Sequence, residues 1–240
     1  MTTENAYQIL DTLIEQDKSF AIYRLPGESV PRFVMQTSGI PSSFNNIEEL
    51  NEQKGFTVAP FRVNDSSPIL LIRPDCTDLT EVKLEKGDNH QKETSSLSHK
   101  QTDKEEYGKL FTLFHDSLMN EEIEKLVLSR SKTIDKEETF SAGRSFFHAV
   151  EKYIYSYVYL FHTPQSGTWL GSTPEILLSG TGRDWKTIAL AGTRFPNSKK
   201  VLWDDKNLWE QELVSIYLLD QLTNFNIVPT VRGPYTVKAG

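Results

Sequence analysis

Apolar residues recur at helical spacing in several stretches of the chain. Near the N-terminus, Leu10, Leu13 and Ile14 share one helical face, with acidic and amide residues opposite. A longer apolar stripe, which runs from Tyr107 to Leu118, marks another amphipathic helix. In all, the periodicity predicts helices over residues 5–17, 46–53, 104–119, 142–153 and 204–222.

Short runs of β-branched and aromatic residues between these helices predict strands. The first two surround the turn Pro26-Gly27-Glu28. The predicted strands cover residues 19–24, 30–37, 55–61, 69–73, 124–132, 153–162, 168–171, 175–179, 185–190 and 225 to the end. Helices and strands alternate without a strict βαβ period, so the sequence predicts an α+β fold with large antiparallel sheets.

A polar stretch divides the chain. Residues 84–104 are rich in Lys, Glu, Ser and Gln and contain His90 and His99. The stretch lacks the apolar residues that would hold metal ligands still, so we interpret it as an exposed linker between a strand-rich part, 1–83, and a second part, 105–240.

The composition of the chain excludes some classes of function. A net charge of −7 and a pI near 5.3 argue against binding to nucleic acid or to anionic membranes, which requires a basic face. The single cysteine, Cys76, cannot form an internal disulfide, and no signal peptide or membrane-spanning stretch is evident. We therefore expect a cytoplasmic protein, either an enzyme or a binding domain.

Standard nucleophile, nucleotide and zinc motifs are absent from the sequence. Polar residues in apolar settings are the remaining candidates for chemistry. Lys125 shares a predicted strand face with Val127 and Ser129, so it points either into a semi-enclosed space or out to water. Glu175 follows Pro174 at the mouth of an apolar strand, where it is either a general acid of raised pKa or an exposed turn residue.

Two further segments have the same character. Small residues at Ala191 and Gly192 let a ligand approach the backbone closely. In the last predicted helix, Glu210 lines up with an apolar stripe, a costly position unless the carboxylate binds a cation or pairs with Lys206 one turn earlier.

Four stretches in this order, KLVLSR, WLGSTPE, ALAGTR and KNLWEQELV, resemble the chorismate-utilising enzymes, isochorismate synthases most closely. The resemblance runs from about residue 104 to residue 240, and residues 1–83 resemble the variable N-terminal part of the same family. It implies a sandwich of two facing antiparallel sheets with helices outside. It also implies a small-molecule substrate, chorismate, that is converted to isochorismate with Mg²⁺ as cofactor, for menaquinone or siderophore synthesis.

The resemblance also implies a role for each matching residue. Lys125 falls on the base that activates water, Glu175 on the acid that protonates the leaving hydroxyl, and Glu210 on a magnesium ligand. The substrate-binding loop of the family falls on Leu190, Ala191, Gly192 and Thr193. Relatives that use ammonia carry glutamine in place of Lys125 or lysine in place of Ala191, so this pair indicates water as the nucleophile.

Two departures from the family accompany these matches. Gln211 stands where a histidine usually follows the metal-binding glutamate, and relatives continue beyond Gly240. We therefore expect a fold that is incomplete at the C-terminus, with self-association through unpaired strand edges, and no isochorismate synthase activity from the 240 residues alone. Two alternatives stay open: a salicylate synthase, which also eliminates pyruvate, and an inactive homologue that only binds a partner or ligand.

Overall fold

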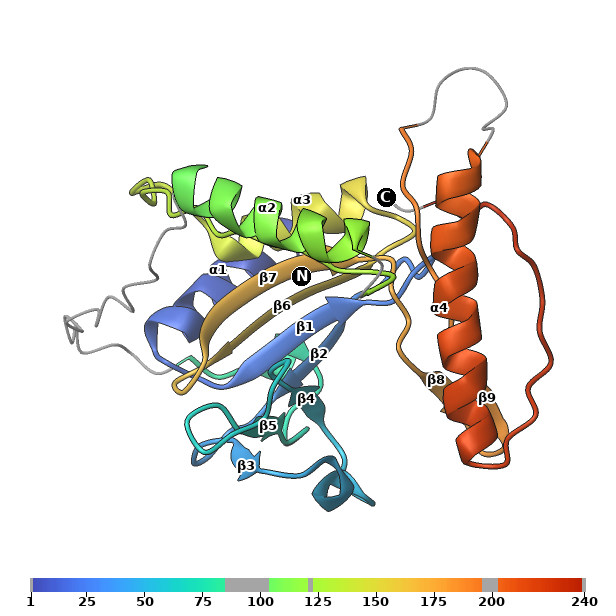
Figure 1. The fold of residues 1–240 in the computed structure, drawn as a ribbon. Helices are drawn as coiled ribbons and strands as arrows, with labels where there is room; N and C mark the ends of the chain where they lie inside the picture. Colours follow the sequence, from blue (N-terminus) through green and yellow to red (C-terminus); the bar gives the residue numbers. More distant parts are fainter. Residues whose placement is uncertain (1, 85–103, 121–122, 196–202, 239–240) are drawn as a thin grey trace. The chain divides into compact units, whose positions relative to one another are not determined.

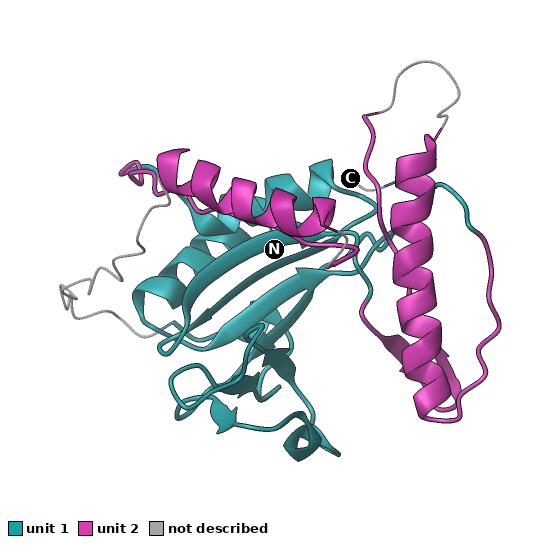
Figure 2. Ribbon diagram, in the orientation of Figure 1, with its two compact units in different colours: residues 1–90, 139–176, 234–240 teal, residues 91–138, 177–233 magenta. Residues whose placement is uncertain are grey.

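The computed structural model describes residues 2–84, 104–120, 123–195 and 203–238. The predicted linker, His90 and His99 included, lies almost entirely outside the described residues. Two compact units divide the chain (Figure 2): unit 1 comprises Met1–His90, Thr139–Ile176 and Pro234–Gly240, and unit 2 comprises Gln91–Glu138 and Leu177–Gly233. No helix in the described part of the chain is both long enough and apolar enough to cross a membrane.

Unit 1 is built on a four-stranded antiparallel sheet, which we call the main sheet (Figure 1). Its strand order is β2-β1-β6-β7. The strands are β1 (Phe20–Arg24), β2 (Arg32–Met35), β6 (Tyr157–Thr163) and β7 (Gly167–Thr173). A smaller antiparallel sheet of order β3-β5-β4 comprises β3 (Ser42–Phe44), β4 (Phe56–Val58) and β5 (Ile69–Ile72). Two short 3₁₀ helices, η1 (Ile47–Leu50) and η2 (Leu79–Glu81), complete this part of the chain.

The two faces of the main sheet bury different partners because side chains alternate along a strand. Phe20 and Ile22 of β1 join a cluster with Leu10 of α1 (Thr3–Glu15) and Phe146 of α3 (Ala142–Lys152). On the opposite face, Ala21 shares a second cluster with residues of β2, β5 and β6, namely Val34, Ile72 and Phe161. The helices and the small sheet thus cover opposite faces of the main sheet.

Close contacts join α1 to α3. A Cβ on Gly143 would lie 2.6 Å from the carbonyl oxygen of Tyr7, so only glycine lets the two helices approach this closely. The carboxylate of Asp11 also accepts hydrogen bonds from the hydroxyl of Ser141 and the backbone N–H of Gly143. At the other end of α3, the buried guanidinium of Arg24 donates to the carbonyl oxygens of Tyr153 and Ile154.

Unit 2 comprises α2 (Lys104–Met119), a two-stranded antiparallel sheet of β8 (Ser179–Thr181) and β9 (Asp184–Lys186), and α4 (Asp205–Asn224). Neither α2 nor α4 has a buried residue among those described. The side chains that could form a core in this unit therefore remain partly or fully exposed.

The α+β class is confirmed, and the five predicted helices are found within a few residues of their expected bounds, with 46–53 as the 3₁₀ helix η1. Two predicted strands are wrong, because residues 124–132 and 225–238 belong to no strand. Several others are shorter than predicted. The predicted strand 175–179 keeps only Ser179, 185–190 keeps only Trp185 and Lys186, and 55–61 keeps only Phe56–Val58. The sandwich, the truncation and the domain boundaries at 83 and 105 stay predictions.

Candidate active site

A lysine and a glutamate that lie 85 residues apart in the sequence meet in unit 2. The ammonium of Lys125 donates a hydrogen bond to Glu210 Oε1 over 3.1 Å. The two side chains keep 33% and 35% of their surface exposed, so water reaches the ion pair and screens it. The carboxylate of Glu210 therefore pairs with Lys125, and the alternative pairing with Lys206 is wrong.

The segment that carries Lys125 runs extended past α2. Two leucines of the segment line a cavity of about 130 Å³ together with one face of α2; its lining is Phe111, Phe114, His115, Leu118, Leu126 and Leu128. The guanidinium carbon of Arg130 lies 5.7 Å from the centre of the Tyr107 ring, also on α2. These contacts hold residues 126, 128 and 130 on one side of the segment.

Lys125 is out of phase with those residues and reaches Glu210 instead of α2. Val127, which has the same phase as Lys125, is 78% exposed. The two-residue alternation that the sequence predicted is therefore present although the strand is not, because an extended backbone alternates its side chains without a hydrogen-bonded partner.

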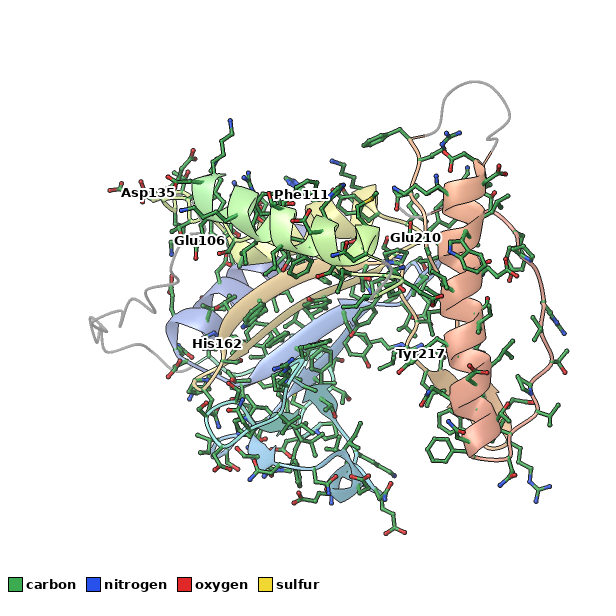
Figure 3. The ribbon with its side chains drawn as sticks, in the orientation of Figure 1. Glu106, Phe111, Asp135, His162, Glu210 and Tyr217 are labelled. Atoms are coloured by element: carbon green, nitrogen blue, oxygen red, sulfur yellow. The ribbon has the colours of Figure 1, made fainter. Side chains whose placement is uncertain are left out.

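The helix that carries Glu210 begins at a well-formed cap. Asp204 Oδ1 accepts hydrogen bonds from the backbone N–H of Asn207 at 2.9 Å and from its side-chain amide at 2.7 Å. These two bonds hold the pKa of the Asp204 carboxyl below its ordinary value of 3.8. Figure 3 labels Glu210 and Tyr217 on the same side of this helix, two turns apart, and Tyr217 is 62% exposed.

Residues 189–194, which we call the small-residue segment, lie along the first turns of α4. The side-chain amide of Gln211 donates to the carbonyl oxygen of Ala189 over 3.3 Å. Arg194 lies 3.3 Å from Asp204 at the cap. Of the four predicted substrate-binding residues, Leu190, Ala191 and Gly192 are half-buried and Thr193 is exposed.

Glu175 belongs to unit 1, in the stretch that follows β7. Its side chain is exposed, and its backbone N–H donates to the hydroxyl of Thr173 over 3.1 Å. The structure thus brings Lys125, Glu210 and the small-residue segment together within unit 2. The position of Glu175 relative to them is not determined.

The donors at Glu210 fit one kind of magnesium site. Among the described residues, no group of three or more His, Cys, Asp or Glu side chains could enclose a metal ion. Mg²⁺ usually keeps several water ligands and takes one or two protein carboxylates together with oxygens of its substrate. A single half-exposed carboxylate suits such an open site and does not suit a closed protein cage.

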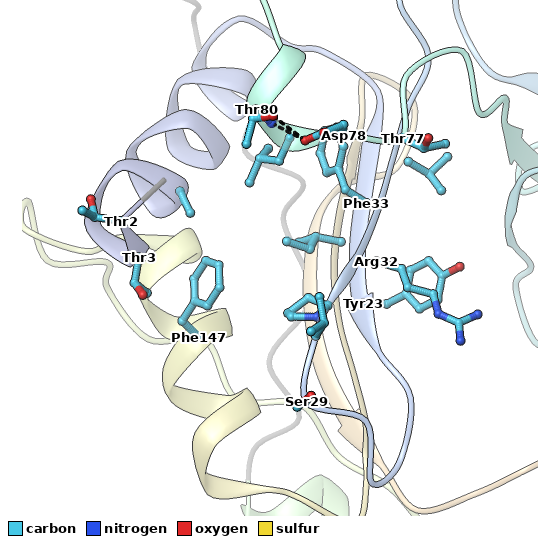
Figure 4. A pocket seen from close by; sticks show the side chains of 16 residues that line it. Thr2, Thr3, Tyr23, Ser29, Arg32, Phe33, Thr77, Asp78, Thr80 and Phe147 are labelled. Carbon is cyan, nitrogen blue, oxygen red and sulfur yellow. Dashed lines mark hydrogen bonds between the residues drawn. The ribbon is translucent and has the colours of Figure 1, made fainter.

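Another cavity, larger than the one beside α2, lies within unit 1 and measures about 1120 Å³ (Figure 4). Its lining runs from the start of α1 to β2 and to Asp78, whose carboxylate accepts from the backbone N–H and the hydroxyl of Thr80. Its lining includes none of the predicted site residues, so volume alone would have pointed to a different place.

Sequence reasoning missed the residues that support this site. Asp204 carried a recognisable signal, because an aspartate directly before a predicted helix is a typical N-cap. Asn207 carried no such signal, since polar residues on a helix ordinarily face water, and Gln211 was noted only because it replaces the histidine of the family. Their contacts with the small-residue segment depend on how the chain returns along α4.

Comparison with known proteins gives one match. The family model described as "Chorismate binding enzyme" matches residues 47–238. Neither the search of curated proteins nor that of solved structures finds a match. Because the family match spans most of the chain and includes every segment that meets on α4, the protein belongs to the chorismate binding enzymes.

Proposed function

We propose that this chorismate-utilising enzyme is an isochorismate synthase, which adds water at C2 of chorismate and expels the hydroxyl at C4. The observation that carries the proposal is the contact between Lys125 and Glu210 beside the small-residue segment. The lysine at 125 and the alanine at 191 favour water over ammonia as the nucleophile. Menaquinone or siderophore synthesis is the pathway that we propose for the product.

Each proton in this reaction has a proposed carrier. Lys125 accepts a proton from the attacking water, and Glu175 donates one to the departing hydroxyl, which leaves as water. The reaction is then balanced, because one water enters and one leaves. Return of both groups to their starting protonation states completes the cycle.

The ion pair places a condition on this mechanism. A general base must have room for a proton, whereas the ammonium of Lys125 is hydrogen-bonded to Glu210 Oε1. We therefore propose that Lys125 leaves Glu210 when substrate binds, where Mg²⁺ would take its place. Glu210 would hold the ion, which would neutralise the carboxylates of chorismate and polarise the leaving group.

Product analysis tests this function. The full-length protein is incubated with chorismate and MgCl₂, and the products are separated by liquid chromatography. We expect isochorismate in the wild-type protein and in Lys132→Gln, an exposed lysine of the same extended segment, and none in Lys125→Gln. Salicylate with pyruvate would indicate a salicylate synthase instead. Binding of chorismate without turnover would indicate the inactive binding domain, and either result would contradict the proposal.

A further inference from the structure

One polar stripe of α4 faces the small-residue segment. Asp204, Asn207, Gln211 and Ser215 follow one another at i, i+3, i+7 and i+11, which puts them on one side of a helix. Three of them contact the segment at successive points, in antiparallel order. Asp204 meets Arg194, Asn207 meets Gly192, and Gln211 meets Ala189.

The middle contact is the closest. Gly192 has φ of +72°, a left-handed conformation that favours glycine. A Cβ built on it would lie 2.9 Å from Asn207 Oδ1 and 3.3 Å from the ring of Trp203. The backbone of the segment therefore rests directly on the helix at this point.

Gln211 uses its side-chain amide for two neighbours. Nε2 donates to the carbonyl oxygen of Ala189 over 3.3 Å and to Ser215 Oγ over 3.0 Å. The second bond fixes the carboxamide along the helix, and the first then fixes the backbone of the segment. Glu210 directly precedes Gln211, so consecutive residues of α4 bind Lys125 and the small-residue segment.

We propose that Gln211 is a positioning residue, which holds residues 190–193 on α4 so that their backbone meets chorismate beside Glu210. The inference rests on the proposed function, because chorismate is the ligand that the segment would meet. Gln211 itself touches the segment and not the substrate. Its loss should therefore weaken substrate binding through the mobility of the segment.

The test compares Gln211→Met with Gln221→Met in the full chain. Methionine keeps the length of glutamine and its helix propensity but cannot donate a hydrogen bond. Gln221 is an exposed glutamine of the same helix, so its replacement is the matched control. Amide hydrogen exchange of a peptide that spans residues 187–195 is measured without ligand, and the chorismate Kd is measured with Mg²⁺ by tryptophan fluorescence.

In Gln211→Met we expect exchange in this peptide about fivefold faster and a chorismate Kd raised about tenfold, with both unchanged in Gln221→Met. Ser215→Ala removes one hydrogen-bond partner of Gln211, so it should raise the exchange rate and the chorismate Kd by smaller factors. If Gln211→Met fails to fold, Ser215→Ala replaces it as the test.

Three results would overturn the inference. Unchanged exchange would mean that Gln211 does not hold the segment. Faster exchange with a wild-type Kd would mean that the contact is only structural. Wild-type protein that binds no chorismate would refute the proposed function. It would also refute the role of Gln211 in substrate positioning, even if hydrogen exchange shows that Gln211 holds the segment on α4.

Discussion

At the scale of single residues, the Lys125–Glu210 pair is easy to exchange. Both side chains are about one-third exposed, and ion pairs in such settings contribute about 0–1 kcal/mol to stability. A divalent cation that is also bound by substrate oxygens can displace the ammonium of Lys125, because the free energy lost with the ion pair is this small. The ion pair is therefore compatible with the two roles that we propose once substrate binds, Lys125 as a base and Glu210 as a metal ligand.

Replacing Lys125 by methionine separates these two roles. We expect loss of turnover, because no base remains, while chorismate still binds. The Mg²⁺ concentration needed for half-maximal chorismate binding should fall by up to about fivefold, since the ammonium no longer competes for Glu210. Calorimetric titration with Mg²⁺ in the presence of chorismate measures this, with Lys132→Met as control. Turnover close to wild type would remove Lys125 from the mechanism.

Asp204 gives α4 a defined dependence on pH. Because its pKa is depressed by the Asn207 amides, the ionised cap stabilises the fold above the unfolded value of 3.8, and this contribution disappears as pH falls through the lower folded value. Asn also caps helices well but does not titrate. We therefore expect Asp204→Asn to match wild type at pH 7 and to lose less stability between pH 5 and pH 3 in urea unfolding. Equal losses would show that Asp204 contributes nothing to the acid sensitivity.

At the scale of elements, Arg24 ties the end of β1 to the end of α3. The carbonyl oxygens of Tyr153 and Ile154, just beyond the end of α3, accept from the backbone N–H groups of Ser156 and Gly27, and Arg24 donates a further hydrogen bond to each. Burial lowers the pKa of Arg24, yet the negative end of the helix dipole favours a cation at this position. The contact therefore joins a strand and a helix that are distant in sequence.

Arg24→Met should cost about 1.5–3 kcal/mol of unfolding free energy, because it removes the hydrogen bonds that a buried cation donates to two carbonyl oxygens. The matched control is Arg32→Met, since Arg32 pairs with Glu28 where both side chains are exposed, and such pairs contribute about 0–1 kcal/mol. Urea unfolding at pH 7 compares the two. A loss below that of Arg32→Met would contradict the role given to Arg24.

At the scale of the whole molecule, the described apolar core belongs to unit 1. All fully buried apolar side chains in the described residues lie there. In unit 2, the apolar side chains of α4 remain largely exposed, among them Leu208, Trp209, Ile216 and Tyr217. Local stability follows buried apolar contacts, so the two units should differ in how readily their helices open.

Hydrogen exchange tests this difference. We expect amides of α3 and β6 to exchange at least tenfold more slowly than those of α4 and α2, because only the first pair is packed in a core. Mass spectrometry of peptides at micromolar concentration measures it. Protection of α4 equal to that of α3 would mean that another surface covers α4, and an increase in protection with protein concentration would identify that surface as a second copy.

The sequence alone predicted most local structure and the chemistry of the family. The helix positions followed from apolar periodicity, which is visible within the sequences of α1, α3 and α4 themselves. The phase of residues 125–130 also followed, because alternation is a property of an extended backbone and needs no partner. The family of the chain was recognised from four short stretches, since their residue types in that order are specific even where each is weak.

Only the tertiary structure decided which residues meet. The strand predicted over 124–132 failed because strand propensity describes a residue in a paired, half-buried ladder, and within the part of the chain that the structure describes no strand pairs with this segment. The pairing of Glu210 with Lys125 instead of Lys206 had no local signal, because a contact across 85 residues depends on the path of the chain between them. For the same reason the sequence marked Gln211 only as a replacement for the family's histidine, and its contact with Ala189 was not predicted.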